Sequence, residues 1–207
     1  MTTRDIERFF RLAAARHPGP ARVLLFGGGA AIIQTRPRDT LDLDMELEVA
    51  GAERDPSLIE PLVTALQEAG ASLKINVQAG VLVHRWSMIN WGDYRNHQRL
   101  WKVFGGIRVS LLEPEYFALS KLGRASPVDL DDIRHVLTRH KASWKILANA
   151  CGRALRESPL STAQDAFRRI VEHFLESEGP KIWGKTYKPS EAIAEFRKAY
   201  SKKAAAG

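Results

Sequence analysis

The sequence predicts an α/β protein of the α+β type, in which a mixed sheet flanked by helices is followed by an all-helical carboxyl-terminal part. Three observations predict this class. Strand-like apolar runs alternate with helical spacing over residues 1–112, and helical spacing alone fills residues 113–200. The composition, 44% apolar and 27% charged, is that of a folded globular chain, and 207 residues are enough to bury a core.

The amino-terminal part alternates the two kinds of element. Residues 41–49 are the clearest strand, because apolar and acidic residues alternate strictly and give one buried face. Glycines 27–29 follow an apolar strand and open a short helix. Helices are predicted over residues 5–17, 30–33 and 55–69, the last ended by Gly70, and strands over residues 22–26, 41–49, 73–77, 81–84 and 107–112.

The carboxyl-terminal part carries helix start signals at Ser126-Pro127 and Ser161-Thr162. Helices are predicted over residues 115–123, 127–140, 143–157, 162–178 and 191–200. We therefore expect a first domain over residues 1–124, a helical region over 125–200 and a flexible tail over 201–207.

Composition excludes several classes of protein. Cys151 is the only cysteine, so an internal disulfide and a cysteine-cluster zinc site are excluded. No apolar run reaches the length of a membrane span, and the acidic residues near Met1 do not fit a secretory signal. We expect a cytoplasmic protein without membrane partners.

The net charge of +7 is unevenly distributed. Residues 1–60 hold 8 basic and 10 acidic groups, whereas residues 61–207 hold 23 basic and 14 acidic groups. An acidic region within a basic chain favours a polyanionic partner such as a nucleotide or nucleic acid. Ordinary solubility explains the same charge, so this signal is weak by itself.

Two acids and a glycine turn carry the chemistry. Asp42 and Asp44 are two residues apart, so in a strand both project from one face and are close enough to share a divalent cation. Backbone amides at Gly27 and Gly28, at a helix start, approach phosphate oxygens without a Cβ in the way. The alternatives are a tight packing turn and a solvated strand face. Four acids on one face repel one another, which favours a cation or basic groups beside them.

These residues resemble a family signature. Gly27-Gly28-x-Ala30 followed by Arg38-x-Thr40-x-Asp42-x-Asp44 resembles the nucleotidyltransferase superfamily of the DNA polymerase β fold. Downstream, the run from Glu113 to Leu122, then Arg124 and Asp129-Leu130-x-Asp132-Ile133, is similar to AbiEii-type toxins and related bacterial nucleotidyltransferase-like proteins.

The resemblance implies roles for named residues. Asp42 and Asp44 would bind Mg²⁺ or Mn²⁺. The implied catalytic residues are Asp42, Asp44, Lys121 and Asp132, with Asp129 as the less favoured acid. The implied nucleotide contacts are Gly27, Gly28, Arg38, Thr40, Lys121 and Arg124. By residue type alone, Lys121 is equally a surface lysine and Asp129 and Asp132 equally helix-start acids. Arg38 is equally a partner for Asp39 or Asp42.

The implied reaction transfers a nucleoside monophosphate from an NTP to RNA, such as tRNA, or to a protein side chain. The resemblance also implies a toxin–antitoxin or phage-defence role, with a cognate antitoxin or other partner protein. Polymerase-type members carry a third metal-binding acid on a later strand, where this chain offers Asn76, with Asp93 as a substitute. The alternative is therefore an inactive member of the fold that binds nucleotide, nucleic acid or a partner protein.

A last segment combines aromatic and basic residues. Residues 86–101 contain Trp86, Trp91, Tyr94 and Trp101 among arginines and His97. Such a mixture suits stacking on bases. Core aromatics under a loop explain it equally well.

Overall fold

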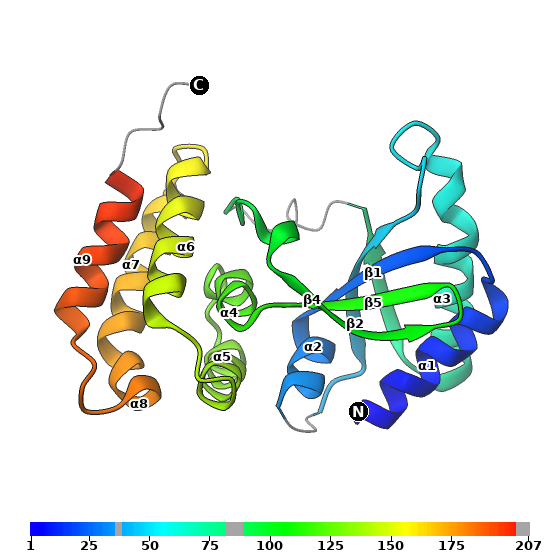
Figure 1. The fold of residues 1–207 in the computed structure, drawn as a ribbon, viewed down its shortest axis with the longest axis horizontal. Coiled ribbons are helices and arrows are strands. Elements are labelled where there is room, and N and C mark those ends of the chain that lie inside the picture. Colours follow the sequence, from blue (N-terminus) through cyan, green and yellow to red (C-terminus); the bar gives the residue numbers. More distant parts are fainter. Residues whose placement is uncertain (36–38, 82–88, 202–207) are drawn as a thin grey trace. The chain divides into compact units, whose positions relative to one another are not determined.

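The computed structural model describes residues 1–35, 39–81 and 89–201 (Figure 1). The chain divides into two compact units. The first unit comprises Met1–Val83 and Gln98–Leu112, and the second comprises His84–His97 and Glu113–Gly207. The domain limits expected at residues 124 and 200 stay a prediction, while the compact units change over between Leu112 and Glu113.

The first unit is built on a mixed sheet of five strands in the order β3-β2-β1-β5-β4. Strand β1 pairs antiparallel with β2 and parallel with β5, β2 pairs parallel with β3, and β4 pairs antiparallel with β5. The mixed α/β class predicted from the sequence is confirmed. The strands are β1 (Ala21–Phe26), β2 (Asp42–Glu48), β3 (Asn76–Gly80), β4 (Gln98–Phe104) and β5 (Ile107–Leu112).

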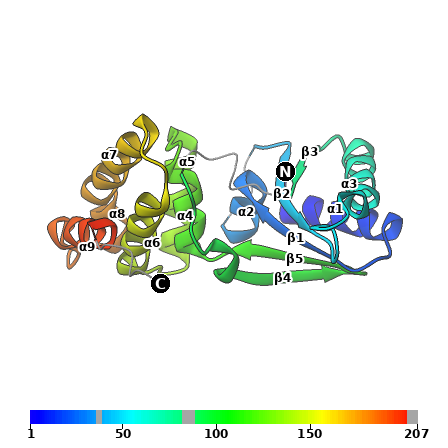
Figure 2. The same ribbon diagram turned by 90° about the horizontal axis from the view of Figure 1, so that it is seen from above.

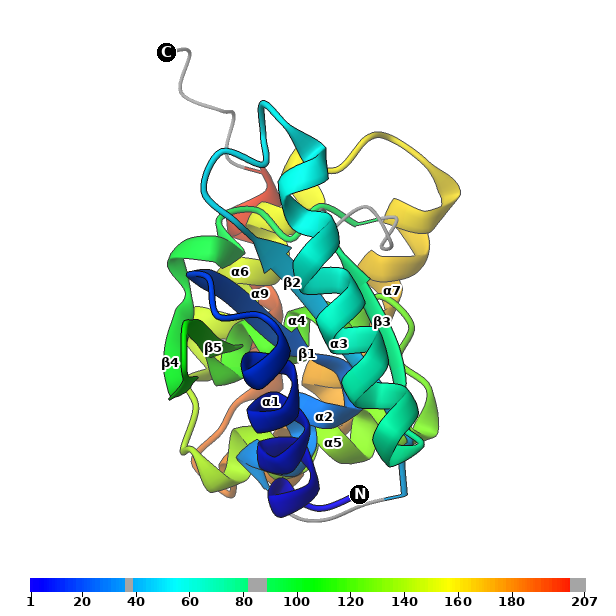
Figure 3. The same cartoon turned by 90° about the vertical axis from the view of Figure 1, so that its right-hand side faces the viewer.

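The helices of the first unit lie on one face of this sheet, as Figures 2 and 3 show. Two glycines allow helices to pack closely on the sheet. A Cβ at Gly29 would lie 2.6 Å from Leu43 Cδ2, and a Cβ at Gly70 would lie 2.6 Å from Val77 Cγ2. Helix α1 begins at a capping box of Thr2 and Asp5. The helical segments are α1 (Thr3–Arg16), α2 (Gly27–Gln34), the 3₁₀ turn η1 (Pro56–Ile59) and α3 (Glu60–Leu73).

Strand β2 has the two faces that its alternation predicts. Leu43, Met45 and Leu47 are buried, and the acids at 42, 44, 46 and 48 occupy the other face by strand geometry. Two residues depart from the expected pattern. Leu41 precedes the strand and is 66% exposed, and the carboxylate of Glu46 is buried.

The predicted end of the helix over residues 55–69 and the predicted start of the strand over residues 73–77 are wrong, and the strand predicted over residues 81–84 lies mostly outside the described residues. Helix α3 continues past Gly70 to Leu73, because Gly70 serves close packing against Val77 and the backbone of Ile75 instead of ending the helix. The helix ends at Lys74, whose φ of 56° is left-handed, so β3 begins at Asn76 instead of residue 73. Of the strand expected at 81–84, Val81 lies in a bend and residues 82–84 lie outside the described residues.

Strand β4 was not predicted. Its residues are mostly exposed, because it lies at one edge of the sheet, so they lack the alternation of a half-buried strand. A bulge between Leu100 and Lys102 shifts its register and breaks the alternation further.

The second unit is helical, as predicted. Ser126 and Asp129 form a capping box at the start of α5, and Ser161 accepts a hydrogen bond from the Gln164 amide at the start of α7. The tail at 202–207 lies outside the described residues. The helical segments are η3 (Tyr94–Asn96), α4 (Pro114–Leu122), α5 (Pro127–Arg139), α6 (Trp144–Glu157), α7 (Thr162–Ser177), α8 (Gly179–Trp183) and α9 (Pro189–Ser201).

Within residues 1–35, 39–81 and 89–201, no helix has the length and apolar character needed to cross a bilayer.

The contact between α6 and α9 depends on Gly152. A Cβ at this position would overlap Ala199 Cβ and lie 2.7 Å from the backbone oxygen of Phe196. We expect Gly152→Val to lower the free energy of unfolding by about 1–3 kcal/mol, because the two helices must move apart. Urea denaturation followed by circular dichroism measures this loss. Ile146→Val, on the half-exposed face of α6, is the control and should change stability little; equal losses in the two variants would contradict the prediction.

Candidate functional site

The first part of the site is the turn after β1. Gly27 has a φ of +62°, a conformation that favours glycine, and begins α2 directly after the strand. The N-cap residue is Phe26, whose side chain has no hydrogen-bond acceptor, so it does not cap the first-turn amides. Gly28 is buried in the same turn of the helix. The start of α2 thus has the geometry that binds anions in other proteins.

Asp44 lies against this turn. The antiparallel register pairs Asp44 with Phe26, the residue before Gly27. A Cβ on Gly27 would overlap Asp44 Oδ2 and lie 3.0 Å from Asp44 Cγ, so the absence of a side chain at 27 makes room for the carboxylate. The Asp44 side chain is half-buried. The predicted association of the glycine turn with an acid of β2 is therefore present.

Asp42 is exposed and is held by two polar neighbours. Asn76 pairs with Asp42 in the parallel register of β2 and β3, and its Nδ2 donates a hydrogen bond of 2.9 Å to Asp42 Oδ1. The backbone N–H of Asp42 donates to Thr40 Oγ1 over 3.3 Å. Thr40, predicted as a nucleotide contact, thus fixes the entry of the chain into β2.

The donor set suits a hard divalent cation. Asp42 and Asp44 occupy alternate positions of one strand, so both carboxylates belong to the same face. Mg²⁺ and Mn²⁺ take oxygen ligands, and Mg²⁺ in particular binds through one or two carboxylates and completes its shell with water and phosphate oxygens. In the part of the chain that the structure describes, no group of three or more His, Cys, Asp or Glu side chains is arranged to hold a metal. Asp42 and Asp44 are the two carboxylates that the predicted site offers to such a cation.

The other predicted residues form an ion cluster within the second unit. Lys121 Nζ lies 2.8 Å from Asp129 Oδ1 and 2.9 Å from Asp132 Oδ2. Arg124 makes a two-pronged contact with Asp129, of 2.6 Å through Nε and 2.7 Å through Nη2. The side chains of Lys121, Asp129 and Asp132 are at most 7% exposed, whereas that of Arg124 is 76% exposed.

The surroundings of Asp129 in this cluster favour its ionised form. Burial opposes its ionisation, but hydrogen bonds from Arg124, Lys121 and Ser126 outweigh that effect and hold its pKa well below the ordinary value. The Ser126 hydroxyl and amide both donate to Asp129 Oδ2, at 2.7 and 3.2 Å. The same carboxylate therefore serves as part of the helix cap and as the anion of a buried ion pair.

Comparison with known families bears on both units. The family model described as nucleotidyltransferase of unknown function, DUF6036, matches residues 5–174. The chain belongs to this family. The expected membership of the nucleotidyltransferase superfamily is confirmed, while the narrower likeness to AbiEii-type toxins stays a prediction. Searches of curated proteins and of solved structures found no match.

Two further predicted residues have separate outcomes. Arg38 lies outside the described residues. Asp93, considered as a third acid of the nucleotidyltransferase site, lies in the second unit, where it accepts a hydrogen bond of 2.7 Å from the Tyr116 hydroxyl.

Asp93 belongs to a polar network that the sequence did not reveal. Arg153 Nη2 lies 2.6 Å from the Tyr116 oxygen and 3.3 Å from Asp93 Oδ1. The His97 ring stacks on Tyr116 at 4.1 Å and lies between the carboxylates of Asp93 and Glu113, at 3.3 and 3.0 Å. These residues come from α4, α6 and the residues that flank η3 and α4, and the segments that carry them are far apart in the sequence. The network ties the segment around η3 to the helices of the second unit.

The aromatic segment divides between interior and surface roles. Trp91 and Tyr94 are buried and form an edge-to-face pair with ring centroids 5.7 Å apart. Trp101 is half-buried on β4 and contacts Phe10 and Phe104. Trp86 lies outside the described residues. The structure therefore favours the packing interpretation for Trp91, Tyr94 and Trp101.

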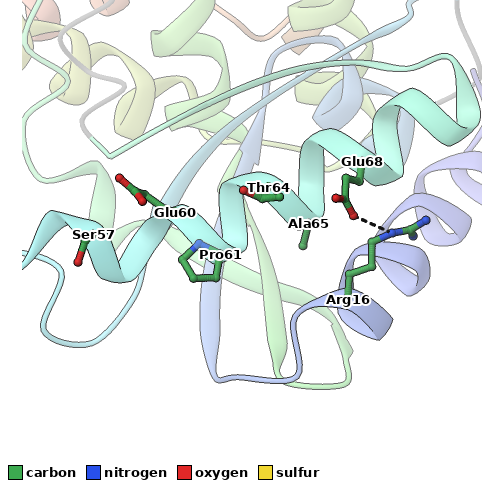
Figure 4. Close-up of a pocket in the computed structure, with 7 residues that line it drawn as sticks. All are labelled: Arg16, Ser57, Glu60, Pro61, Thr64, Ala65 and Glu68. Atoms are coloured by element: carbon green, nitrogen blue, oxygen red, sulfur yellow. Dashed lines mark ion pairs between the residues drawn. The ribbon is translucent and has the colours of Figure 1, made fainter.

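A surface hollow of about 630 Å³ lies beside α1 and α3 (Figure 4). An ion pair of 3.2 Å between Arg16 Nε and Glu68 Oε2 crosses one end of it. It contains none of the predicted site residues and is lined by Arg16, Ser57, Glu60, Pro61, Thr64, Ala65 and Glu68.

The contact between Gly27 and Asp44 makes a prediction about stability. We expect Gly27→Ala to cost about 1–2 kcal/mol for the left-handed backbone and a further 1–3 kcal/mol, roughly, for displacing the Asp44 carboxylate. Gly105→Ala is a matched control, because Gly105 has a φ of +54° and a Cβ there would make only an ordinary contact of 3.4 Å with Ala14. Urea denaturation of both variants measures the difference, and equal losses would show that the overlap is unimportant.

The lowered pKa of Asp129 makes a prediction about pH. Because the folded-state pKa lies below the ordinary value of 3.8, ionised Asp129 stabilises the fold above that pH and loses its effect as pH falls through the folded-state pKa. We expect Asp129→Asn to lose about 3 kcal/mol at pH 7, with a difference from the parent that shrinks below pH 3.8. Denaturation at several pH values measures both effects. Asp131→Asn, half-exposed on the same helix, is the control, and a pH-independent difference for Asp129→Asn would contradict the assignment.

Proposed function

We propose that this nucleotidyltransferase moves a nucleoside monophosphate from an NTP to an RNA acceptor, with a divalent cation bound by Asp42 and Asp44. The observation that carries the proposal is the position of Asp44, which lies against the left-handed glycine turn that opens α2. A carboxylate beside a helix start whose N-cap residue makes no side-chain hydrogen bond, with a second carboxylate on the same strand face, suits a metal-bound triphosphate. Family membership independently supports the class of reaction.

The residues of the first unit divide the work. The amides at Gly27 and Gly28 bind phosphate oxygens, where the helix start favours negative charge. Asp42 and Asp44 hold Mg²⁺ or Mn²⁺. The Thr40 hydroxyl keeps Asp42 in place by accepting a hydrogen bond from the Asp42 backbone N–H. When bound, the cation supplies positive charge to the reacting phosphate and to the leaving pyrophosphate.

The roles proposed in the second unit differ by exposure. The side chain of Arg124 is 76% exposed while bound to Asp129, so of the two nucleotide contacts predicted in the second unit it is the one at the surface. Lys121 is buried between Asp129 and Asp132. We propose that Lys121 and Asp132 act by holding this cluster and Arg124 in position.

Charge favours RNA as the acceptor. The chain carries a net charge of +7, with its excess of basic groups after residue 60. A basic protein attracts a polyanion at long range and binds it with a salt-dependent affinity. A toxin or phage-defence role with a cognate partner protein, which the likeness to AbiEii-type proteins implies, is the corresponding proposal for its cellular setting.

One observation favours a second candidate function. Asn76 lies beside Asp42, on the strand where the resemblance to polymerase-type nucleotidyltransferases implies a third metal-binding acid. An inactive member of the fold would bind nucleotide through the glycine turn without transferring it. Binding of NTP without transfer to any acceptor would therefore replace the first proposal with this one.

Labelling with α-³²P NTPs tests the proposed reaction. The whole protein is incubated with each NTP, Mg²⁺ and either total RNA or tRNA. We expect label in RNA, and we expect Asp42→Asn combined with Asp44→Asn to reduce it by roughly a hundredfold or more, since the bound cation contributes several kcal/mol to the transition state.

Glu48→Gln is the matched control for this test. Glu48 lies on the same strand face and makes an exposed contact of 3.4 Å with Arg22, away from the glycine turn. It should leave labelling unchanged. Label in protein instead of RNA would show that the acceptor is a protein. Equal labelling by the double variant and the parent would show that the cation site is wrongly assigned.

A further inference from the structure

We propose that Asn76 is a positioning residue for the cation site of Asp42 and Asp44, which orients Asp42 through a neutral amide and so leaves the site with two carboxylates for a single divalent cation. This inference rests on the proposed function of the two aspartates. It adds a third side chain, from the neighbouring strand, and a definite number of cations.

The strand pairing places Asn76 beside Asp42. The two residues are partners in the parallel register of β2 and β3, so their side chains share one face of the sheet. Asn76 is anchored at this position, because its backbone N–H donates a hydrogen bond of 2.7 Å to the oxygen of Leu41. The start of β3 and the residue preceding Asp42 are thereby joined directly.

The side-chain contact has a direction. Nδ2 of Asn76 donates over 2.9 Å to Oδ1 of Asp42, which occupies one oxygen of that carboxylate and fixes its rotation. Hydrogen bonds that orient a metal-binding carboxylate typically change metal affinity by about 10- to 100-fold when removed. Both side chains are exposed, so without this bond the carboxylate would rotate freely in solvent.

The neutral side-chain amide of Asn76 also limits the negative charge beside Asp42. An asparagine can donate to a neighbouring carboxylate, whereas an ionised aspartate only accepts hydrogen bonds and repels it. With Asn76 in place, residues 42, 44 and 76 supply two carboxylates and one neutral amide, and two carboxylates suit one divalent cation. Two cations held about 4 Å apart need further carboxylates to offset their mutual repulsion.

A matched control lies two residues along β3. Gln78 pairs with Asp44 in the same register and is exposed, so it presents an amide on the same face. Among the described residues, no hydrogen bond joins the Gln78 side chain to Asp44. Gln78→Ala therefore removes an amide from the same strand without removing an orienting contact.

Titration of the full-length protein with Mn²⁺, followed by electron paramagnetic resonance, tests the proposal. We expect one Mn²⁺ per chain in the parent and in Gln78→Ala, with equal affinity. Asn76→Ala should also bind one Mn²⁺, with an affinity about tenfold lower. Asn76→Asp should bind two, and the second ion should broaden the signal of the first through their magnetic interaction. A merely structural role for Asn76 would not change this number.

The outcomes separate this inference from the function on which it rests. If the parent binds no Mn²⁺, or if the double variant at Asp42 and Asp44 binds as well as the parent, the cation site itself is wrong. If the parent binds two ions, if Asn76→Ala keeps full affinity, or if Asn76→Asp still binds one ion, the cation site stands and the role of Asn76 is wrong. Should Asn76→Ala fail to fold, as judged by circular dichroism, Asn76→Ser supplies the affinity comparison.

Discussion

The antiparallel register of β1 and β2 is the constraint on which the site depends. It sets Asp44 opposite Phe26, next to the left-handed Gly27. A slip of one residue would turn every side chain of β2 to the other face. That slip would expose Leu43 and Met45, which are fully buried, and would drive the acids into the apolar packing beneath α2. The hydrophobic core therefore also fixes the direction in which Asp42 and Asp44 point.

The two units use carboxylates in different ways. Asp129 is fully buried, and Lys121, Arg124 and Ser126 supply hydrogen bonds to both of its oxygens, so its charge is balanced within the protein. Asp42 is exposed, and its carboxylate accepts a hydrogen bond from the neutral amide of Asn76. A balanced buried acid stabilises a fold, whereas an exposed acid oriented by an amide keeps its charge available for a ligand.

The sequence predicted those features that depend on local patterns. Strict alternation predicted β2 and its acidic face, and serine followed by proline or threonine predicted the starts of α5 and α7. Features that depend on pairing between distant segments were not predicted. The edge strand β4 has no buried face of its own, and Gly70 has the residue type of a helix end although it serves close packing. The contact between Asn76 and Asp42 follows from the register of two strands 34 residues apart.

The motifs of the two units consequently carry different weight for function. In the second unit, the spacing of Lys121, Arg124 and Asp129 is explained by folding alone, because a helix cap and a buried ion pair require it. In the first unit, the buried residues Leu43, Met45 and Leu47 account for the packing of β2. Asp44 lies against the glycine turn that begins α2, and Asp42 is exposed and oriented by Asn76. The apolar packing of β2 does not explain this arrangement of two acids, so the inference of function rests chiefly on the first unit.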